Sequence, residues 1–209
     1  GLLFNPDAGF EYSDLGYSLL GAVIAAASGQ TYEDYMQENL LTPLGMGTST
    51  FLLEDVDRSL LANPHIPNKA GEVVAAEALP YHRPFAGANN LFTSVEDLAK
   101  LAQASLAHGE LAGERVLSEE AFAEMWESHT ATPFGGYPFG KVYSDSLMDE
   151  FGYGWFIGNV EDHKAYNTFG REHGYHAGMI VIPDANLAVI AMGNGPVMDN
   201  YYASQIAVD

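Results

Sequence analysis

The stretch Phe10-Glu11-Tyr12-Ser13-Asp14-Leu15-Gly16-Tyr17 lies where an extended segment gives way to a long apolar run. Large apolar residues in that run recur at i, i+4 and i+8, a spacing that predicts a helix with a buried stripe. Ser13 or Asp14 would cap its start, and Gly29 would end it. The sequence therefore places the Tyr12 phenol at the positive end of a buried helix, where a phenolate or a polarised hydroxyl is favoured.

Composition limits the classes of partner. The 209 residues include 28 acidic and eight basic ones, giving a net charge of −20, which disfavours nucleic acid and anionic lipid. The acids are scattered, as on a solvated surface. No run approaches the roughly 20 apolar residues of a membrane span, and residues 1–4 lack the basic start and apolar core of a signal peptide. Without cysteine there are no disulfides or thiolate metal sites, and the cellular compartment is not determined.

The C-terminal part predicts a sheet. Residues 179–182 and 187–192 are apolar and rich in β-branched side chains, and the turn sequence Pro183-Asp184-Ala185-Asn186 joins them. Residues 151–157 read as a further strand and residues 197–207 as a helix. Upstream, Thr31, Ser94 and Ser118 each precede a helical pattern. We expect an α/β (α+β) fold, an antiparallel sheet flanked by helices. Residues 1–150 would form a mostly helical lobe with long loops and 151–209 the C-terminal strands and helix, together one domain fragment.

Phe4-Asn5-Pro6 and residues 10–17 resemble the Tyr-x-Asn segment of the serine β-lactamase and penicillin-binding-protein family, in its class C β-lactamase, D-alanyl-D-alanine peptidase and esterase branch. The resemblance implies that Tyr12 acts as a general base or acid beside a nucleophilic serine, with Asp14 in place of the asparagine that orients substrate. An anionic Asp14 would pair with a lysine, which makes an esterase or D-amino-acid peptidase a better expectation than a strict β-lactamase.

Further segments follow the family in order. Residues 41–46 and 151–157 resemble its helical stop and its strand entrance, and residues 84–94 resemble its Pro-Ala-Gly-Gly segment. Aligned from Asp97, Asn89-Asn90 stands at the two glycines, so Asn90 is a candidate for lining a substrate cleft.

The family's third motif, Lys-Thr-Gly or His-x-Gly, precedes such a C-terminal hairpin. Counting back from Pro183 without a gap aligns Thr168-Phe169-Gly170 with this motif. Gly170 then matches its glycine, whereas Thr168 stands where the motif has lysine or histidine. Arg171, His173 and His176 are the nearby candidates to supply it, with His173 as a possible proton-transfer group. Gly170 would let substrate approach the strand edge closely.

No metal site and no cofactor are expected. His173 and His176 are spaced like a metal-ligand pair, and Glu172 could join them. Zinc sites, however, need three or four converging ligands, and Gly174 argues against a helix that would present the pair on one face.

The family's Ser-x-x-Lys nucleophile has no counterpart in the chain. The residues three before the four lysines are Ile66, Asp97, Pro138 and Glu161. The resemblance therefore predicts the C-terminal portion of a serine hydrolase acting on a small-molecule ester, amide or lactam, inactive alone, with the serine on a complementary N-terminal chain or segment that covers a large apolar surface. The alternative is a non-catalytic binding module on the same scaffold.

Overall fold

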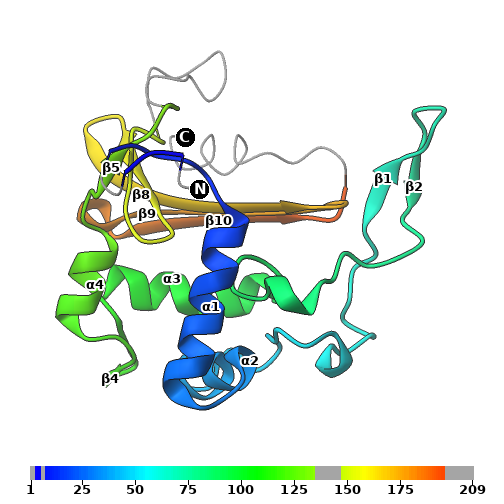
Figure 1. Cartoon of the computed structure of the whole chain (residues 1–209), viewed down its shortest axis with the longest axis horizontal. Coiled ribbons are helices and arrows are strands. Elements are labelled where there is room, and N and C mark those ends of the chain that lie inside the picture. Colours follow the sequence, from blue (N-terminus) through cyan, green and yellow to red (C-terminus); the bar gives the residue numbers. More distant parts are fainter. Residues whose placement is uncertain (1–2, 6–7, 135–146, 196–209) are drawn as a thin grey trace.

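A six-stranded antiparallel sheet dominates the computed structural model, which describes residues 3–5, 8–134 and 147–195. Its strand order is β10-β9-β8-β7-β6-β5. The strands are β5 (Thr130–Ala131), β6 (Glu150–Phe151), β7 (Phe156–Val160), β8 (His163–Glu172), β9 (Tyr175–Ile182) and β10 (Leu187–Gly193). The helices gather below the sheet in Figure 1. The predicted fold class, an antiparallel sheet flanked by helices, is confirmed.

Within the described residues, four α-helices and four short helical turns precede or interrupt the strands. They are α1 (Asp14–Ser28), α2 (Tyr32–Met36), η1 (Gln37–Leu41), η2 (Leu53–Asp55), η3 (Arg83–Phe85), α3 (Val95–Leu106), α4 (Glu119–Met125) and η4 (Pro183–Ala185). The helix expected over 197–207 lies outside the described residues.

Side-chain caps start the helices as the sequence predicts. Ser13 caps α1, with its Oγ accepting from the N–H of Gly16 at 3.0 Å, and Gly29 ends the helix at φ 72°. Thr31, Ser94 and Ser118 cap α2, α3 and α4 in the same manner. Each cap gives one of the free N–H groups of a first helical turn a partner.

Two layers of apolar side chains pack on the two faces of the sheet. Phe156, Ala165, Ile180 and Ile182 form one buried cluster, which none of the four α-helices joins. On the opposite face, Met179 and Val181 pack with Ala102 of α3 and with Phe122 and Trp126, in α4 and at its end. The alternation along β9 explains its continuously apolar sequence, because both of its faces are covered.

Helix α1 is the element whose burial differs from the prediction. Gly21 is its only buried residue, and Leu15, Leu19, Leu20 and Val23 are each 54–63% exposed. The helix contacts α2 and η3 along its opposite side. The predicted buried stripe is therefore wrong within this chain. It forms instead the large exposed apolar surface that the sequence also led us to expect.

Residues 151–157 also differ, because they do not make one strand. Phe151 belongs to β6 and Phe156 begins β7, and the intervening turn carries Gly154 at φ 79°. The N–H of Gly152 and the carbonyl of Trp155 close this turn at 2.9 Å. The left-handed glycine explains why an apolar, aromatic run reverses here instead of continuing.

The described residues form two small hairpins outside the main sheet, one between α2 and α3 and one directly after α3. β1 (His65–Pro67) and β2 (Val73–Ala75) pair and project from the body in Figure 1. β3 (Glu110–Leu111) and β4 (Glu114–Arg115) pair just after α3. None of the described helices is both long and apolar enough to span a bilayer.

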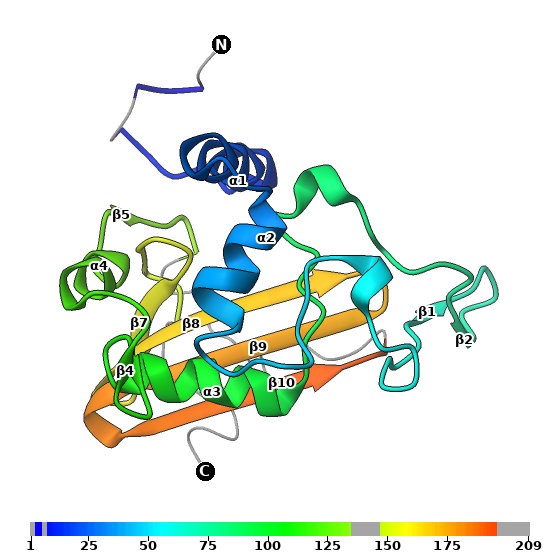
Figure 2. The ribbon, with the colours of Figure 1, turned by 90° about the horizontal axis from the view of Figure 1, so that it is seen from below.

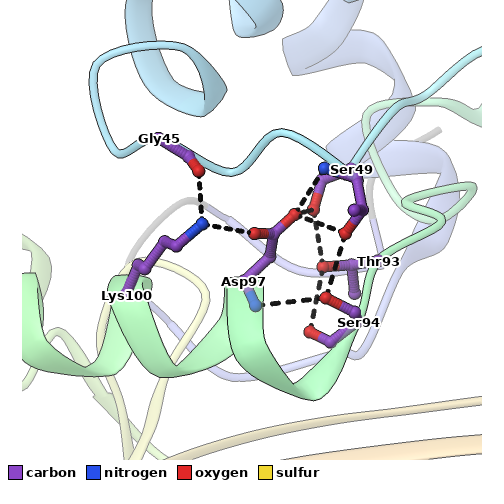
Figure 3. A network of polar contacts seen from close by, with 7 residues as sticks. Gly45, Ser49, Thr93, Ser94, Asp97 and Lys100 are labelled. Atoms are coloured by element: carbon purple, nitrogen blue, oxygen red, sulfur yellow. Dashed lines mark hydrogen bonds and ion pairs between the residues drawn. The ribbon is translucent and has the colours of Figure 1, made fainter.

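Asp97 anchors the start of α3 to the loop before β1 (Figure 3). Its side chain is nearly inaccessible, at 2% exposure, and Oδ2 accepts from Thr48 N and Oγ1 and from Ser49 Oγ at 2.7–2.8 Å. Oδ1 accepts from Lys100 Nζ at 2.8 Å. These bonds favour the carboxylate and lower the pKa of Asp97 from 3.8 to about 2, against the effect of its burial.

Candidate active site

The mouth of α1 presents Tyr12 and Asp14 together. Burial raises the pKa of the Tyr12 phenol, and both the charge of Asp14 and a side-chain hydrogen bond with it act in the same direction. The phenol therefore donates to the carboxylate and is held neutral. The sequence led us to expect a phenolate or a polarised hydroxyl at this helix terminus. The raised pKa disfavours the phenolate, whereas the hydrogen bond to Asp14 polarises the hydroxyl.

A chain of aromatic rings joins this mouth to the third-motif strand. Phe10, two residues before Tyr12, lies 6.4 Å from the ring of Phe156 between centroids. Phe156 in turn stacks on Phe169 at 5.4 Å and 15°. Since Phe169 directly precedes Gly170, the tyrosine segment and the glycine of β8 are tied through two ring contacts, although they are far apart in the sequence.

Tyr17 makes a second link from α1 to the sheet. The backbone of Gly154, in the turn between β6 and β7, hydrogen-bonds its hydroxyl, while burial raises the pKa of the phenol. Figure 2 agrees, showing α1 on the β8 side of the sheet with β10 at the far edge. Two motif segments, residues 10–17 and the turn after Phe151, therefore meet.

The other side of α1 is fixed by a close backbone approach. Cα of Gly87 lies against Gly21, and a Cβ at Gly87 would come 2.5 Å from the carbonyl oxygen of Tyr17. Only glycine fits such an approach. The loop that resembles the family's Pro-Ala-Gly-Gly segment thus sets the position of α1.

β8 offers an open edge at the third motif. β7 pairs with β8 only as far as Asn167, whereas β9 accompanies β8 on to Glu172. Among the described residues, the outer edge of β8 from Thr168 onward has no strand partner. A Cβ built on Gly170 would meet nothing within 4 Å. This edge can hydrogen-bond an extended ligand along its backbone.

The candidate cations divide between two places. Arg171 pairs with His176, so both lie on the sheet face that carries Phe169, away from Thr168. Arg171 is exposed and His176 is buried. His173 is exposed in the turn between β8 and β9. The structure therefore brings Tyr12 and Asp14 together, and it places Arg171 and His176 on the face of the sheet away from Thr168.

The side chain of Asn90 hydrogen-bonds to the backbone near it. Its Nδ2 donates to the carbonyl of His82 at 2.8 Å, and its φ is 76°. This left-handed conformation is where the family segment has glycine, and asparagine is among the residues that tolerate it best. The geometry gives Asn90 a structural explanation, and its predicted contact with substrate stays a prediction.

Sequence reasoning missed the aromatic link. Phe10 and Phe169 flank the two motif positions, and a contact between residues so far apart leaves no local pattern. The sequence analysis also considered Glu172 only as a metal ligand, although the alternation of side chains along β8 places it on the same face of the sheet as Thr168. No group of three His, Cys, Asp or Glu side chains within the described ranges is arranged to hold a metal ion.

The structure combines a helix-covered antiparallel sheet, a tyrosine at the start of α1 and a glycine in the open edge of β8. Comparison with known proteins identifies the family. Residues 1–207 match the Beta-lactamase family model, and the chain belongs to that family. Its members include serine hydrolases such as penicillin-binding proteins and D-alanyl-D-alanine carboxypeptidases.

Individual relatives agree. The chain is 24% identical over 206 residues to "Penicillin-binding protein 4" of Amycolatopsis lactamdurans, covering 94% of this chain and 50% of that protein. The octameric penicillin-binding protein homologue from Pyrococcus abyssi superposes with a TM-score of 0.82 at 28% identity, over 99% of this chain and 43% of that one. D-amino acid amidase from Ochrobactrum anthropi SV3 shares the fold, with a TM-score of 0.78 at 20% identity, over 100% of this chain and 57% of that one. The chain thus spans about half the length of these relatives.

Proposed function

We propose that this chain supplies the tyrosine and strand-edge parts of a serine hydrolase site, which transfers an acyl group from a small ester, amide or lactam to water. The observation that carries the proposal is that Phe10 and Phe169 both contact the ring of Phe156, which brings the segment before Tyr12 and the open edge of β8 to one aromatic side chain. The peptide groups of that edge would hold the substrate, and the tyrosine would exchange a proton with the nucleophile.

The nucleophilic serine would come from a segment outside these residues. No lysine of the chain has a serine three residues before it, so the Ser-x-x-Lys pair is not formed within it. The exposed stripe of α1 begins beside Tyr12 and gives such a segment an apolar surface to pack on. The chain alone would then be inactive.

A fluorophosphonate probe tests the proposal on the full-length protein. We expect a covalent mass increase on one serine, because such probes phosphonylate an activated hydroxyl. Tyr12→Phe should slow labelling by about 10²–10⁴-fold, the usual contribution of a general acid–base group. Tyr35→Phe, at a partly buried tyrosine of α2, is the matched control and should label at the normal rate. Normal labelling of Tyr12→Phe would remove Tyr12 from the reaction.

Packing on α1 can be tested separately. Leu19 is 59% exposed, so Leu19→Gln should change the stability of this chain alone by under about 0.5 kcal/mol. It should nevertheless weaken association with the serine-bearing segment, measured by titrating the two pieces. Leu60→Gln is the control, since Leu60 is 67% exposed and lies outside α1. Equal effects of the two substitutions on association would contradict the proposed contact.

The alternative is a binding module that has lost catalysis. Two observations favour it: burial and the neighbouring Asp14 raise the pKa of Tyr12, and Thr168 stands where the third motif has its cation. Complete absence of labelling on the folded full-length protein would select this alternative.

A further inference from the structure

Five phenylalanines from different segments form one aromatic cluster on the face of the sheet opposite α3 and α4. The ring of Phe156 lies at its centre, with centroids 4.9 Å from Phe151, 5.4 Å from Phe169, 6.3 Å from Phe134 and 6.4 Å from Phe10. Aromatic pairs attract each other at such separations. Each ring therefore limits the movement of its neighbours, and the cluster presents a rigid surface.

Phe169 is the member of this cluster that lies on the open edge of β8. It is 37% exposed, although its ring stacks on that of Phe156 at 15°. Phe156 is the first residue of β7 and is opposite Asn167. The position opposite Phe169, two residues further along β8, is filled by no strand among the described residues. Since opposite residues of a strand pair share a face, a ligand extended along this edge would place a side group there, beside the Phe169 ring.

The apolar surface at this edge is short. Arg171 follows Phe169 on the same face of β8, roughly 7 Å further along the strand, and it is exposed. In the other direction, Asn167 is buried and its amide donates to the carbonyl of Leu147. Phe169 thus lies between two polar side chains. Its exposed surface matches a single ring better than a long alkyl chain, which would extend over the guanidinium.

We propose that the open position opposite Phe169 is a subsite for an aromatic ring, so that the preferred substrates are esters or amides that carry one phenyl-sized group. This proposal rests on the proposed function. The ring of the substrate would pack against Phe169, whose own ring is already held by Phe156, so little conformational entropy would be lost on binding. Gly170, the next residue, leaves the neighbouring stretch of the edge without a side chain.

Hydrolysis of three esters by the full-length protein tests the proposal. They are methyl acetate without a ring, methyl phenylacetate with a ring on the acyl side, and benzyl acetate with a ring on the alcohol side. In each, the serine oxygen forms a bond to the acyl carbon, the alkoxide leaves and takes up a proton, and water hydrolyses the acyl-enzyme to the acid. Titration of the released acid gives kcat/KM. The ratio of kcat/KM for an aromatic ester to that for methyl acetate measures the preference, and comparing this ratio between variants removes the different intrinsic reactivities of the esters.

Phe169→Ala should lower this ratio about five- to tenfold for at least one of the two aromatic esters, equivalent to about 1 to 1.4 kcal/mol and typical of one aromatic pair. Phe169→Leu keeps an apolar side chain on Phe156 but removes the ring, and it should lower the ratio about threefold. This milder variant decides the matter if circular dichroism shows that Phe169→Ala folds poorly.

Leu187→Ala is the matched control. Leu187 is 38% exposed and pairs with Ile182, so it lies on the same face of the sheet as Phe169. It belongs to β10, two strands away from β8. The substitution should therefore leave the ratio unchanged.

The outcomes separate this proposal from the proposed function. A protein that hydrolyses none of the esters and is not labelled by a fluorophosphonate lacks the serine hydrolase function altogether. A protein that is labelled keeps the function, but it overturns the aromatic subsite if it hydrolyses none of the three esters or if Phe169→Ala leaves the ratio unchanged. An equal fall in Leu187→Ala would also overturn the subsite, because the effect would then not be local to Phe169.

Discussion

Replacing Asp97 by asparagine should destabilise the protein severely while keeping the shape of the side chain. Asp97 is 2% exposed, and its two oxygens accept four hydrogen bonds from Thr48, Ser49 and Lys100 (Figure 3). An asparagine keeps one oxygen and turns the other acceptor into a donor, so some of these partners lose their bond. Removing a buried carboxylate from such a set typically costs about 2–4 kcal/mol.

The pKa gives a second estimate of similar size. A pKa of about 2 in the folded state, against an ordinary 3.8, corresponds to about 2.5 kcal/mol of stability from ionisation. Because the folded-state pKa is depressed, this stability is fully present above about pH 5 and is lost as the pH falls through 4 toward 2. Asp97→Asn should remove that part of the acid dependence as well as lowering the stability at neutral pH.

Urea unfolding followed by circular dichroism, repeated from pH 2 to 7, measures both effects. Glu96→Gln is the matched control, because Glu96 is an exposed acid in the same first turn of α3. It should change the free energy of unfolding by less than about 0.5 kcal/mol. The reasoning is refuted if Asp97→Asn is as mild as Glu96→Gln, or if both variants keep the same acid dependence between pH 2 and 4.

Two other substitutions have defined outcomes. Gly87→Ala would place a Cβ 2.5 Å from the carbonyl oxygen of Tyr17 and should lower the free energy of unfolding by about 1–3 kcal/mol, whereas Gly47→Ala, with nothing within 4 Å, should be nearly neutral; equal losses in urea melts would contradict the close approach. Asp14→Asn should lower the raised pKa of Tyr12, because it removes the charge and the carboxylate acceptor but leaves the burial; an unchanged titration of the Tyr12 ring in NMR spectra would show that Asp14 does not hold the phenol.

Local chemistry in the sequence predicted the local structure well. Ser13, Thr31, Ser94 and Ser118 cap helices because a short hydroxyl can reach the free N–H groups of a first turn whatever the rest of the fold does. The β9–β10 hairpin follows from two β-branched runs joined by a turn sequence, in which Asn186 takes φ 49°. The family motifs gave the fold class, and the fold is as they implied.

Predictions that depended on which residues contact each other in the folded chain were less successful. The stripe of α1 has the period of a buried helix, but period alone does not say what covers a helix, and this chain leaves it exposed. The helix-end argument for Tyr12 omitted its burial, the main cause of the raised pKa of the phenol, and Asp14, whose charge and hydrogen bond act in the same direction. Alignment with the third motif identified Thr168 and Gly170, but it did not show on which face of the sheet Arg171 and His176 lie.

The sequence by itself determined the family, the helix starts and the β9–β10 hairpin, because capping, periodicity and motif spacing act over a few residues. The tertiary structure alone decided that Phe10 and Phe169 both contact Phe156 and that Glu172 instead of Arg171 shares the face of Thr168. It also decided that no described strand pairs with the outer edge of β8 beyond Asn167. These features depend on pairing register and on contacts between distant segments, and a shift of one residue in register would exchange every face.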